Sequence, residues 1–183
     1  YEGTWVDGVI DGKGIATYPN GLRYEGGFVN ARNDGFGIMT YPDGYRYEGE
    51  WQDGERHGAG TATYPDGTVY EGQFRDGLRH GQGTITMPTG FRYVGAWANG
   101  EINGEGVATY ANGDVYEGSF RNGKREGEGT MRYATGEQAT GEWIGGALTR
   151  NSTTTPAPGT AETGDAPGSE DTATTPEDPP ASE

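Results

Sequence analysis

Few side chains in this 183-residue sequence could carry out chemistry, and those few recur at one spacing. His57 and His80 are 23 residues apart, and a metal ion shared between them would need their ring nitrogens within about 4 Å of each other. If that spacing belongs to successive two-stranded units, the two rings stand about 10 Å apart and cannot share an ion. We therefore expect two histidines in surface loops and no metal site.

The other candidates for catalysis give no stronger signal. Ser119 has no histidine close to it in the sequence or in register, so no activated nucleophile is expected. The stretch Gly58-Ala59-Gly60 is followed by neither a helix nor the lysine of a phosphate-binding loop, and we interpret it as a turn. A catalytic carboxylate pair should be unique, whereas glutamate recurs at one place of the repeat, at positions 2, 25, 48, 71 and 117. We expect no enzymatic activity and no cofactor.

Composition argues against further classes of function. The sequence has 13 Lys and Arg against 28 Asp and Glu, a net charge of −15, which disfavours a nucleic-acid partner. It has no cysteine to form a disulfide, and no apolar stretch approaches the roughly 20 residues that span a bilayer. We expect a soluble chain, intracellular or peripheral to a membrane. The sequence starts at Tyr1 in register with the repeat and without an initiator Met, which is compatible with a segment that precedes Tyr1 in the natural protein.

A strict 23-residue repeat must position all of these residues. The unit YEGEWQDGERHGAGTATYPDGTV, at 47–69, offers about six residues of strand, a glycine-bearing loop, about five more residues of strand and the turn Pro65-Asp66-Gly67. Each unit is therefore predicted to be a β-hairpin. Six full units start at 1, 24, 47, 70, 93 and 116, and a partial one starts at 139.

The composition changes abruptly after Arg150. Residues 151–183 contain six Pro, seven Asp or Glu, no Lys or Arg and no aromatic residue, which is typical of a disordered segment. We therefore divide the chain into a repeat array at 1–150 and a disordered Thr/Pro/Ala/Glu/Asp-rich tail at 151–183. The array retains 21 of the 28 acidic residues and all 13 basic ones, so it carries a net charge of −8.

The string Y-E-G-x-[WF]-x-[DN]-G-x-x-x-G-x-G recurs at 1, 24, 47, 70 and 116, and in altered form at 93 and 139. It resembles the MORN (membrane occupation and recognition nexus) repeat family over residues 1 to about 146. The sequence departs from the pattern at Ala31, Met87 and Val94, and the last copy lacks its first Tyr. The resemblance implies an all-β, elongated and twisted single-layer antiparallel meander, and a role as a protein-binding scaffold or at membranes.

Side chains alternate across a strand, so Tyr47, Gly49 and Trp51 share one face and Glu48 lies on the other. The glycines let rings from neighbouring strands lie flat over bare backbone, so that one layer can pack a core. We assign the Trp and Phe row to that layer. The remaining aromatic side chains predict a trough for a protein or peptide partner. The expected contacts are Tyr18, Tyr24, Tyr41, Tyr47, Tyr64, Tyr70, Tyr93 and Tyr110.

A second period of 46 residues is superimposed on the first. Trp and Phe alternate at the fifth place of the repeat, and Ala alternates with Met or Ile at the sixteenth. If the hairpin pairs positions whose in-repeat numbers sum to about 21, the two places face each other and their volumes compensate. The alternative is drift in a short array.

A basic strip in the loops provides the rival functional site. It consists of Arg32, Arg56, Arg79, Lys124 and Arg125, expected along one edge of the sheet, where it could meet anionic lipid headgroups or an acidic peptide. The interruption at Ile102 and the acidic neighbours favour ordinary charge-mixed loops instead. A third alternative is a structural spacer that self-associates through edge strands. We favour a scaffold that binds a protein partner through the aromatic trough.

Overall fold

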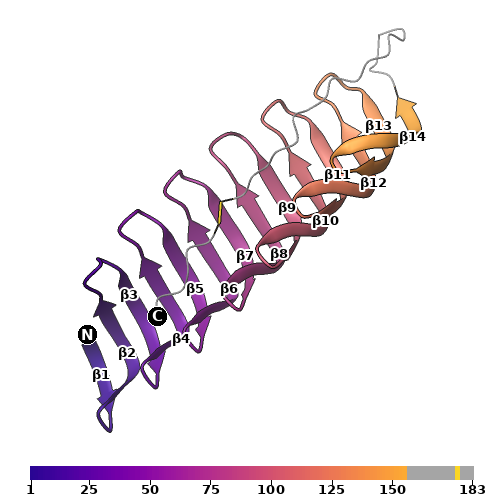
Figure 1. Cartoon of the computed structure of the whole chain (residues 1–183). Helices are drawn as coiled ribbons and strands as arrows, with labels where there is room; N and C mark the ends of the chain where they lie inside the picture. The colour runs from indigo at the N-terminus through magenta and orange to yellow at the C-terminus, as the bar shows by residue number, and fades with distance from the viewer. Residues whose placement is uncertain (156–175, 178–183) are drawn as a thin grey trace.

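The computed structural model describes residues 1–155 and 176–177, and within them the chain forms fourteen β-strands and no helix. Each strand pairs antiparallel with the next in one open sheet, from β1 to β14 in sequence order (Figure 1). The predicted all-β meander of hairpin repeats is confirmed. The strands are β1 Glu2–Val6, β2 Val9–Thr17, β3 Arg23–Val29, β4 Arg32–Thr40, β5 Arg46–Gln52, β6 Glu55–Thr63, β7 Val69–Arg75, β8 Leu78–Thr86, β9 Arg92–Ala98, β10 Glu101–Thr109, β11 Val115–Arg121, β12 Lys124–Arg132, β13 Gln138–Ile144 and β14 Ala147–Thr155.

The turn inside each hairpin is shorter than predicted. In the third repeat Gln52 pairs with Glu55, which leaves a two-residue loop of Asp53 and Gly54 with φ of 51° and 91°. Positive φ at both positions defines a type I′ turn, whose twist matches that of the flanking strands, and Asp-Gly suits it. The returning strand therefore begins earlier and has nine residues. Gly58-Ala59-Gly60 lies within this strand and not in a turn, which corrects the interpretation of these residues.

The turn between hairpins follows the prediction. The N–H of Gly67 donates to the carbonyl of Tyr64 at 2.9 Å, and the N–H of Tyr64 donates to the carbonyl of Thr68 at 2.8 Å. The Asp66 carboxylate accepts a further bond from the N–H of Thr68 at 2.8 Å. Pro65 presets the backbone at the second position of this turn, and Gly67 takes a φ of 88° at its end.

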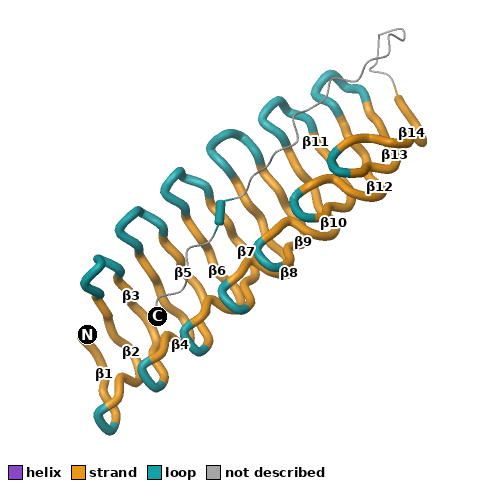
Figure 2. The backbone as a smooth tube through the Cα atoms, viewed as in Figure 1, coloured by secondary structure: helices purple, strands orange, loops and turns teal. Residues whose placement is uncertain are grey.

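A bulge interrupts every hairpin near its middle. Gly49 pairs with Gly60, but the next pair along the ladder is Trp51 with Arg56, so three residues of β6 oppose a single residue of β5. Gly58 lies inside the bulge with a φ of 59°. Bulges bend the strand that carries them. The strands accordingly curve along their length, and the sheet is a bent band and not a flat plane (Figure 2).

The pairing predicted between the fifth and sixteenth places is wrong. Tyr47 and Ala62, at the first and sixteenth places, are directly opposite, so the in-repeat numbers of paired residues sum to 17 on that side of the bulge and to 15 beyond it. Trp51 at the fifth place faces Arg56 instead. The alternation of Trp with Phe and of Ala with Met or Ile is therefore not explained by direct pairing.

A single layer packs a core because its central rows are glycine. A Cβ added to Gly60 would lie 2.6 Å from Cε2 and Cζ of Tyr47, so the ring occupies the space that a side chain would need. A Cβ on Gly49, directly across the ladder, would meet the Gly60 backbone at 2.5 Å and the Tyr47 hydroxyl at 2.6 Å. The prediction that rings lie over bare backbone is confirmed.

The sheet extends five residues past the boundary predicted at 150. Thr153, Thr154 and Thr155 of β14 pair with β13, whose other edge is bonded to β12. Composition assigned this segment to the tail because its side chains are polar, but an edge strand needs only backbone pairing, and threonine favours strands. The last hairpin is therefore a complete pair of strands. Apart from Pro176 and Glu177, the rest of the predicted tail lies outside the described residues.

Candidate functional site

The aromatic face, the side of the sheet that carries Tyr24, Trp51 and their equivalents, has a tightly packed floor. The tyrosines of the first place are 0% exposed from Tyr24 to Tyr116. The Tyr47 ring makes edge-to-face contacts with Trp51 at 5.2 Å and with Phe74 of the next repeat at 5.0 Å, and its hydroxyl donates to a backbone carbonyl at 2.9 Å. The indole N–H of Trp51 donates to the carbonyl of Gly37 at 3.2 Å. The Trp and Phe row is buried as expected beyond the exposed Trp5 at the first edge.

Four of the eight predicted contact tyrosines belong to this floor: Tyr24, Tyr47, Tyr70 and Tyr93. This corrects the expectation that their rings are presented to a partner. Each ring is covered by aromatic neighbours from its own repeat and from the next, because a single-layer sheet has no second layer to supply those contacts.

The other four, Tyr18, Tyr41, Tyr64 and Tyr110, stand at the eighteenth place, where the returning strand enters the turn. Tyr64 is 4% exposed, and the other three are half-buried. Tyr41 and Tyr64 both pack edge-to-face against Tyr45, each at 5.2 Å. We call this line of side chains, half-buried except at Tyr64, the rim row; its members are Tyr18, Tyr41, Tyr64, Met87, Tyr110 and Tyr133.

Three arginines occupy the tenth place on the aromatic face, and two of them, Arg79 and Arg125, lie 5.9 and 5.8 Å from the ring centre of a rim-row tyrosine. Arg56, Arg79 and Arg125 are only 2–3% exposed. Nε and Nη2 of Arg56 donate to the carbonyl of Gly77 at 3.2 and 2.8 Å, and Nη1 donates to the Tyr45 hydroxyl at 3.1 Å. The Arg125 guanidinium lies 4.5 Å from the ring centre of Trp143, within cation–π range. These contacts hold the guanidinium groups in place on the aromatic face.

The predicted basic strip along the loops is therefore wrong for its three tenth-place members. The two-residue turn makes the tenth place part of the strand, and alternation then points it to the aromatic face. Only the ninth-place residues Arg32 and Lys124 are exposed. Arg32 pairs with Asp53 at 3.6 Å, both largely exposed, and such a pair contributes little to stability. Ile10 and Ile102 at the tenth place were the signal in the sequence that this position faces the core.

Burial also sets the protonation of the phenols on this face. It raises the pKa of Tyr24 and of Tyr93 well above the ordinary value, and Asp34 raises that of Tyr24 further. Burial likewise raises the pKa of Tyr133, against the opposing charge of Arg125. The hydroxyls of Tyr24 and Tyr93 donate to the backbone carbonyls of Gly27 and Ala96, at 2.9 and 3.1 Å.

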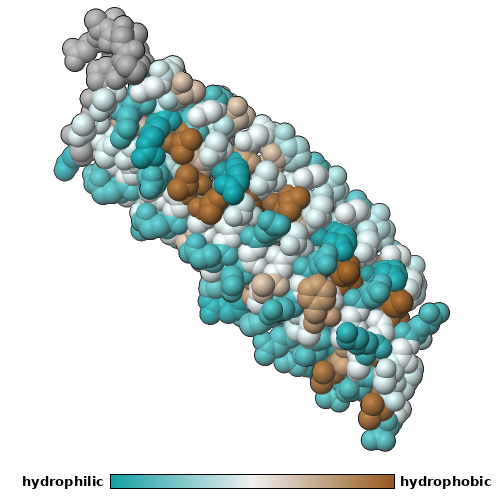
Figure 3. Space-filling model, turned by 180° about the vertical axis from the view of Figure 1, so that it is seen from behind, coloured by the Kyte–Doolittle hydropathy of each residue, from teal (hydrophilic) through white to brown (hydrophobic). Residues whose placement is uncertain are grey.

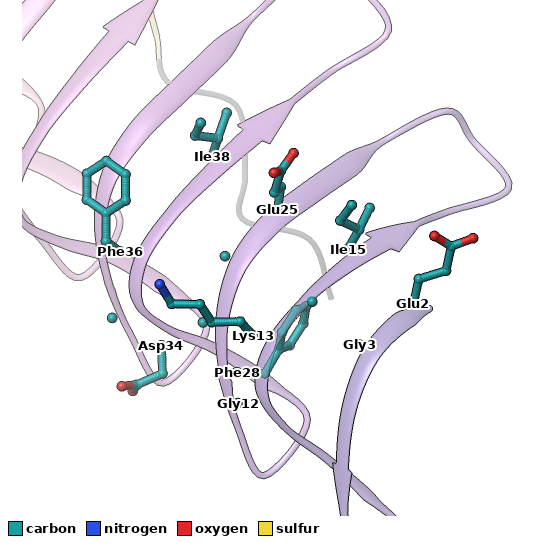
Figure 4. Close-up of a pocket in the computed structure, with 14 residues that line it drawn as sticks. Glu2, Gly3, Gly12, Lys13, Ile15, Glu25, Phe28, Asp34, Phe36 and Ile38 are labelled. Carbon is teal, nitrogen blue, oxygen red and sulfur yellow. The ribbon is translucent and has the colours of Figure 1, made fainter.

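The outer face, opposite the aromatic face, is mostly polar, with separate apolar patches (Figure 3). Near the N-terminus a broad hollow of about 690 Å³ lies over β1 to β4, between side chains that stand on either side of the glycine rows (Figure 4). Ile15, Ile38 and the 61% exposed Phe36 border it, together with Glu2 and Glu25. Sequence reasoning missed this hollow, since it depends on which glycines become neighbours.

The histidines first considered for chemistry lie in strands of the sheet. His57 and His80 lie in strands β6 and β8 and not in the predicted loops. In residues 1–155 and 176–177 no group of three or more His, Cys, Asp or Glu is placed to hold a metal ion. The same residues include no helix long and apolar enough to cross a membrane.

The single-layer sheet of 23-residue hairpins, with glycine rows under aromatic rings, defines a β-repeat protein. The MORN repeat family model matches residues 1–23, 24–44, 47–69, 70–92, 93–115 and 116–138, so this chain belongs to the MORN repeat family. Comparison with curated proteins gives no significant match.

Solved structures show a more distant likeness. The TCP domain of SAS-4 (dCPAP) from Drosophila melanogaster, solved with a proline-rich motif of Ana2 (dSTIL), is 16% identical with a TM-score of 0.46, and the match covers 70% of each chain. The TCP10 domain of Danio rerio CPAP is 18% identical with a TM-score of 0.46, and the match covers 78% of this chain and 66% of that domain.

Proposed function

We propose that this chain is a non-enzymatic repeat scaffold that binds a protein partner through the rim row and the arginines close to it. The observation that carries the proposal is the rim row itself, whose members other than Tyr64 are half-buried, with two guanidinium groups close to it on the same face. Arg79 lies 5.9 Å from the ring centre of Tyr64, and Arg125 lies 5.8 Å from that of Tyr110. Tyr, Trp and Arg are the residues that dominate binding energy in protein interfaces.

The repeat geometry favours an extended ligand. Equivalent side chains on this face recur every two strands, about 10 Å. Three residues of extended peptide cover the same distance. A peptide that crosses the strands would therefore place an anchor in the rim row about every third residue.

The membrane alternative has less support in the geometry. It needs exposed cations, and of its five predicted residues only Arg32 and Lys124 are exposed. Self-association through the two edge strands, β1 and β14, stays a prediction that analytical ultracentrifugation tests.

Selection of peptides from a random display library against the full chain tests the proposal. We expect the selected peptides to bind an outer-face control variant, with Phe36→Ser and Val107→Ser, as tightly as the unaltered chain. We expect at least about tenfold weaker binding to a variant with Tyr18→Ser, Tyr41→Ser and Tyr110→Ser, since truncating anchors costs more than about 1 kcal/mol each. Loss of binding only in the outer-face variant would contradict the proposal. So would selection of no peptide together with Arg32- and Lys124-dependent flotation on vesicles containing phosphatidylserine.

A further inference from the structure

Arg79 makes a contact that its equivalents do not share in the described part of the chain. Arg56 and Arg125 each donate two N–H groups to a turn carbonyl 21 residues ahead. Nη2 of Arg79 donates at 2.7 Å to the carbonyl oxygen of Pro176, which is 97 residues away in the sequence. The C-terminal segment of the chain therefore reaches the aromatic face at the fourth repeat.

The surroundings of Arg79 form a defined site and not an isolated bond. The guanidinium lies 4.9 Å from the ring centre of Trp97, 5.8 Å from Tyr70 and 5.9 Å from Tyr64. Tyr64 is the one buried member of the rim row. The carbonyl of Pro176 thus contacts the face beside the rim position that is most covered. Figure 1 shows this short segment, drawn in yellow, crossing in front of the sheet.

The chemistry of the segment suits the site. Proline has no N–H to leave unbonded and favours an extended backbone whose carbonyls accept hydrogen bonds, and aromatic-lined grooves commonly bind such segments. Pro176 is half-buried and Glu177 is exposed. Residues 151–183 contain seven acidic side chains and no basic one. Their charge is therefore opposite to that of the buried arginines.

The connection is long enough to allow the contact without strain. Thr155 ends β14, and Arg79 lies on β8, six strands or about 29 Å away. The 20 residues between Thr155 and Pro176 can span up to about 70 Å. Because both groups belong to one chain, the contact has an effective concentration of the order of millimolar, so even a weak contact is substantially occupied.

We propose that the aromatic face around Arg79 binds the chain's own C-terminal segment, centred on Pro176 and Glu177, as an extended, acidic, proline-containing ligand. The assignment goes beyond the proposed function and stands without it, because the contact is made within one chain. Where a partner binds the same stretch of the rim row, it has to displace this segment.

A single paramagnetic label on the full chain tests the contact. The chain has no cysteine, so Glu177→Cys accepts one nitroxide, and the four Trp indole N–H signals report distance from it by NMR. Trp97 lies beside the site, whereas Trp5 on β1 is eight strands away, about 38 Å. We expect the largest loss of signal at Trp97 and none at Trp5, and the preference should persist in Arg125→Gln. It should disappear in Arg79→Gln.

A tail variant keeps the test decisive if Arg79→Gln does not fold. Rearranging the order of residues 171–183, with the nitroxide kept at position 177, leaves the whole sheet unaltered and moves Pro176. We expect the preference for Trp97 to be lost in this variant too. Equal loss at all four indoles, no loss at any, or a preference that survives both changes would overturn the assignment. Since no partner is present, these outcomes are independent of the peptide selection.

Discussion

Replacing Gly60 with alanine should destabilise the array by about 2 kcal/mol, the middle of the range for overpacking a filled core. The added Cβ would lie 2.6 Å from two ring carbons of Tyr47, where carbon atoms normally approach to about 3.5–4.0 Å. The ring cannot turn aside, because Trp51 and Phe74 pack against it at 5.2 and 5.0 Å. The backbone of β5 and β6 must move apart instead.

Thermal unfolding of the full chain and hydrogen exchange of the β5, β6 and β7 amides measure this effect. A loss of about 2 kcal/mol corresponds to a fall of roughly 4–8 °C in Tm for a chain of this size. Faster exchange should be confined to the third hairpin and its neighbours, because each repeat contacts only the adjacent ones.

A double-mutant cycle identifies the cause. In a Tyr47→Leu background the ring is gone, so Gly60→Ala should cost at least about 1 kcal/mol less than it does alone. The reasoning is refuted if Gly60→Ala leaves Tm unchanged, or if the coupling between the two substitutions is below about 0.5 kcal/mol.

Three further outcomes follow from the structure. Ala31 occupies the second turn position with a φ of 62°, where L-residues are strained. Ala31→Gly should therefore raise the free energy of unfolding, measured by chemical denaturation, by about 1 kcal/mol. A lower free energy of unfolding would show that the turn is unstrained. The free energy of unfolding should be constant as pH rises to about 10 and should then fall. The tyrosine phenols of the unfolded chain release their protons near a pKa of 10.0, whereas folded Tyr24 and Tyr93 retain theirs. Unfolding followed by circular dichroism at several pH values measures this, and an unfolding midpoint that does not change above pH 10 would contradict it. Deleting 151–183 should lower Tm because it removes half of β14, whereas deleting 156–183 should leave the sheet intact. Equal Tm values for the two truncated chains would show that residues 151–155 of β14 contribute nothing to the stability of the sheet.

Local rules account for the parts of the fold that the sequence predicted. The 23-residue period, the Pro65-Asp66-Gly67 turn and the alternation about Gly49 depend on neighbouring residues and on backbone geometry. The single-layer form came from the family resemblance, and the glycine rows explain physically how such a layer packs.

The candidate site was predicted only in part, because side-chain direction depends on register. The two-residue Asp53-Gly54 turn replaced the longer loop that was expected, and this placed Arg56 in a strand facing the aromatic side. A shift of one residue in a strand exchanges its faces, so a small error in loop length reverses exposure. Tyr47 was misplaced for a different reason, since its burial comes from rings of the adjacent repeat.

The sequence by itself determined the repeat, its turns, and which residue types share a face, because these follow from local backbone preferences and from a period of two. Only the tertiary structure decided that Arg79 lies buried on the aromatic face, that β14 continues to Thr155, and that Pro176 meets the sheet. Each of these depends on contacts between segments that are distant along the chain or on the partner that an edge strand finds. Ile10 and Ile102 at the tenth place indicate that this position faces the core, but no local pattern of residues specifies which distant segments meet there.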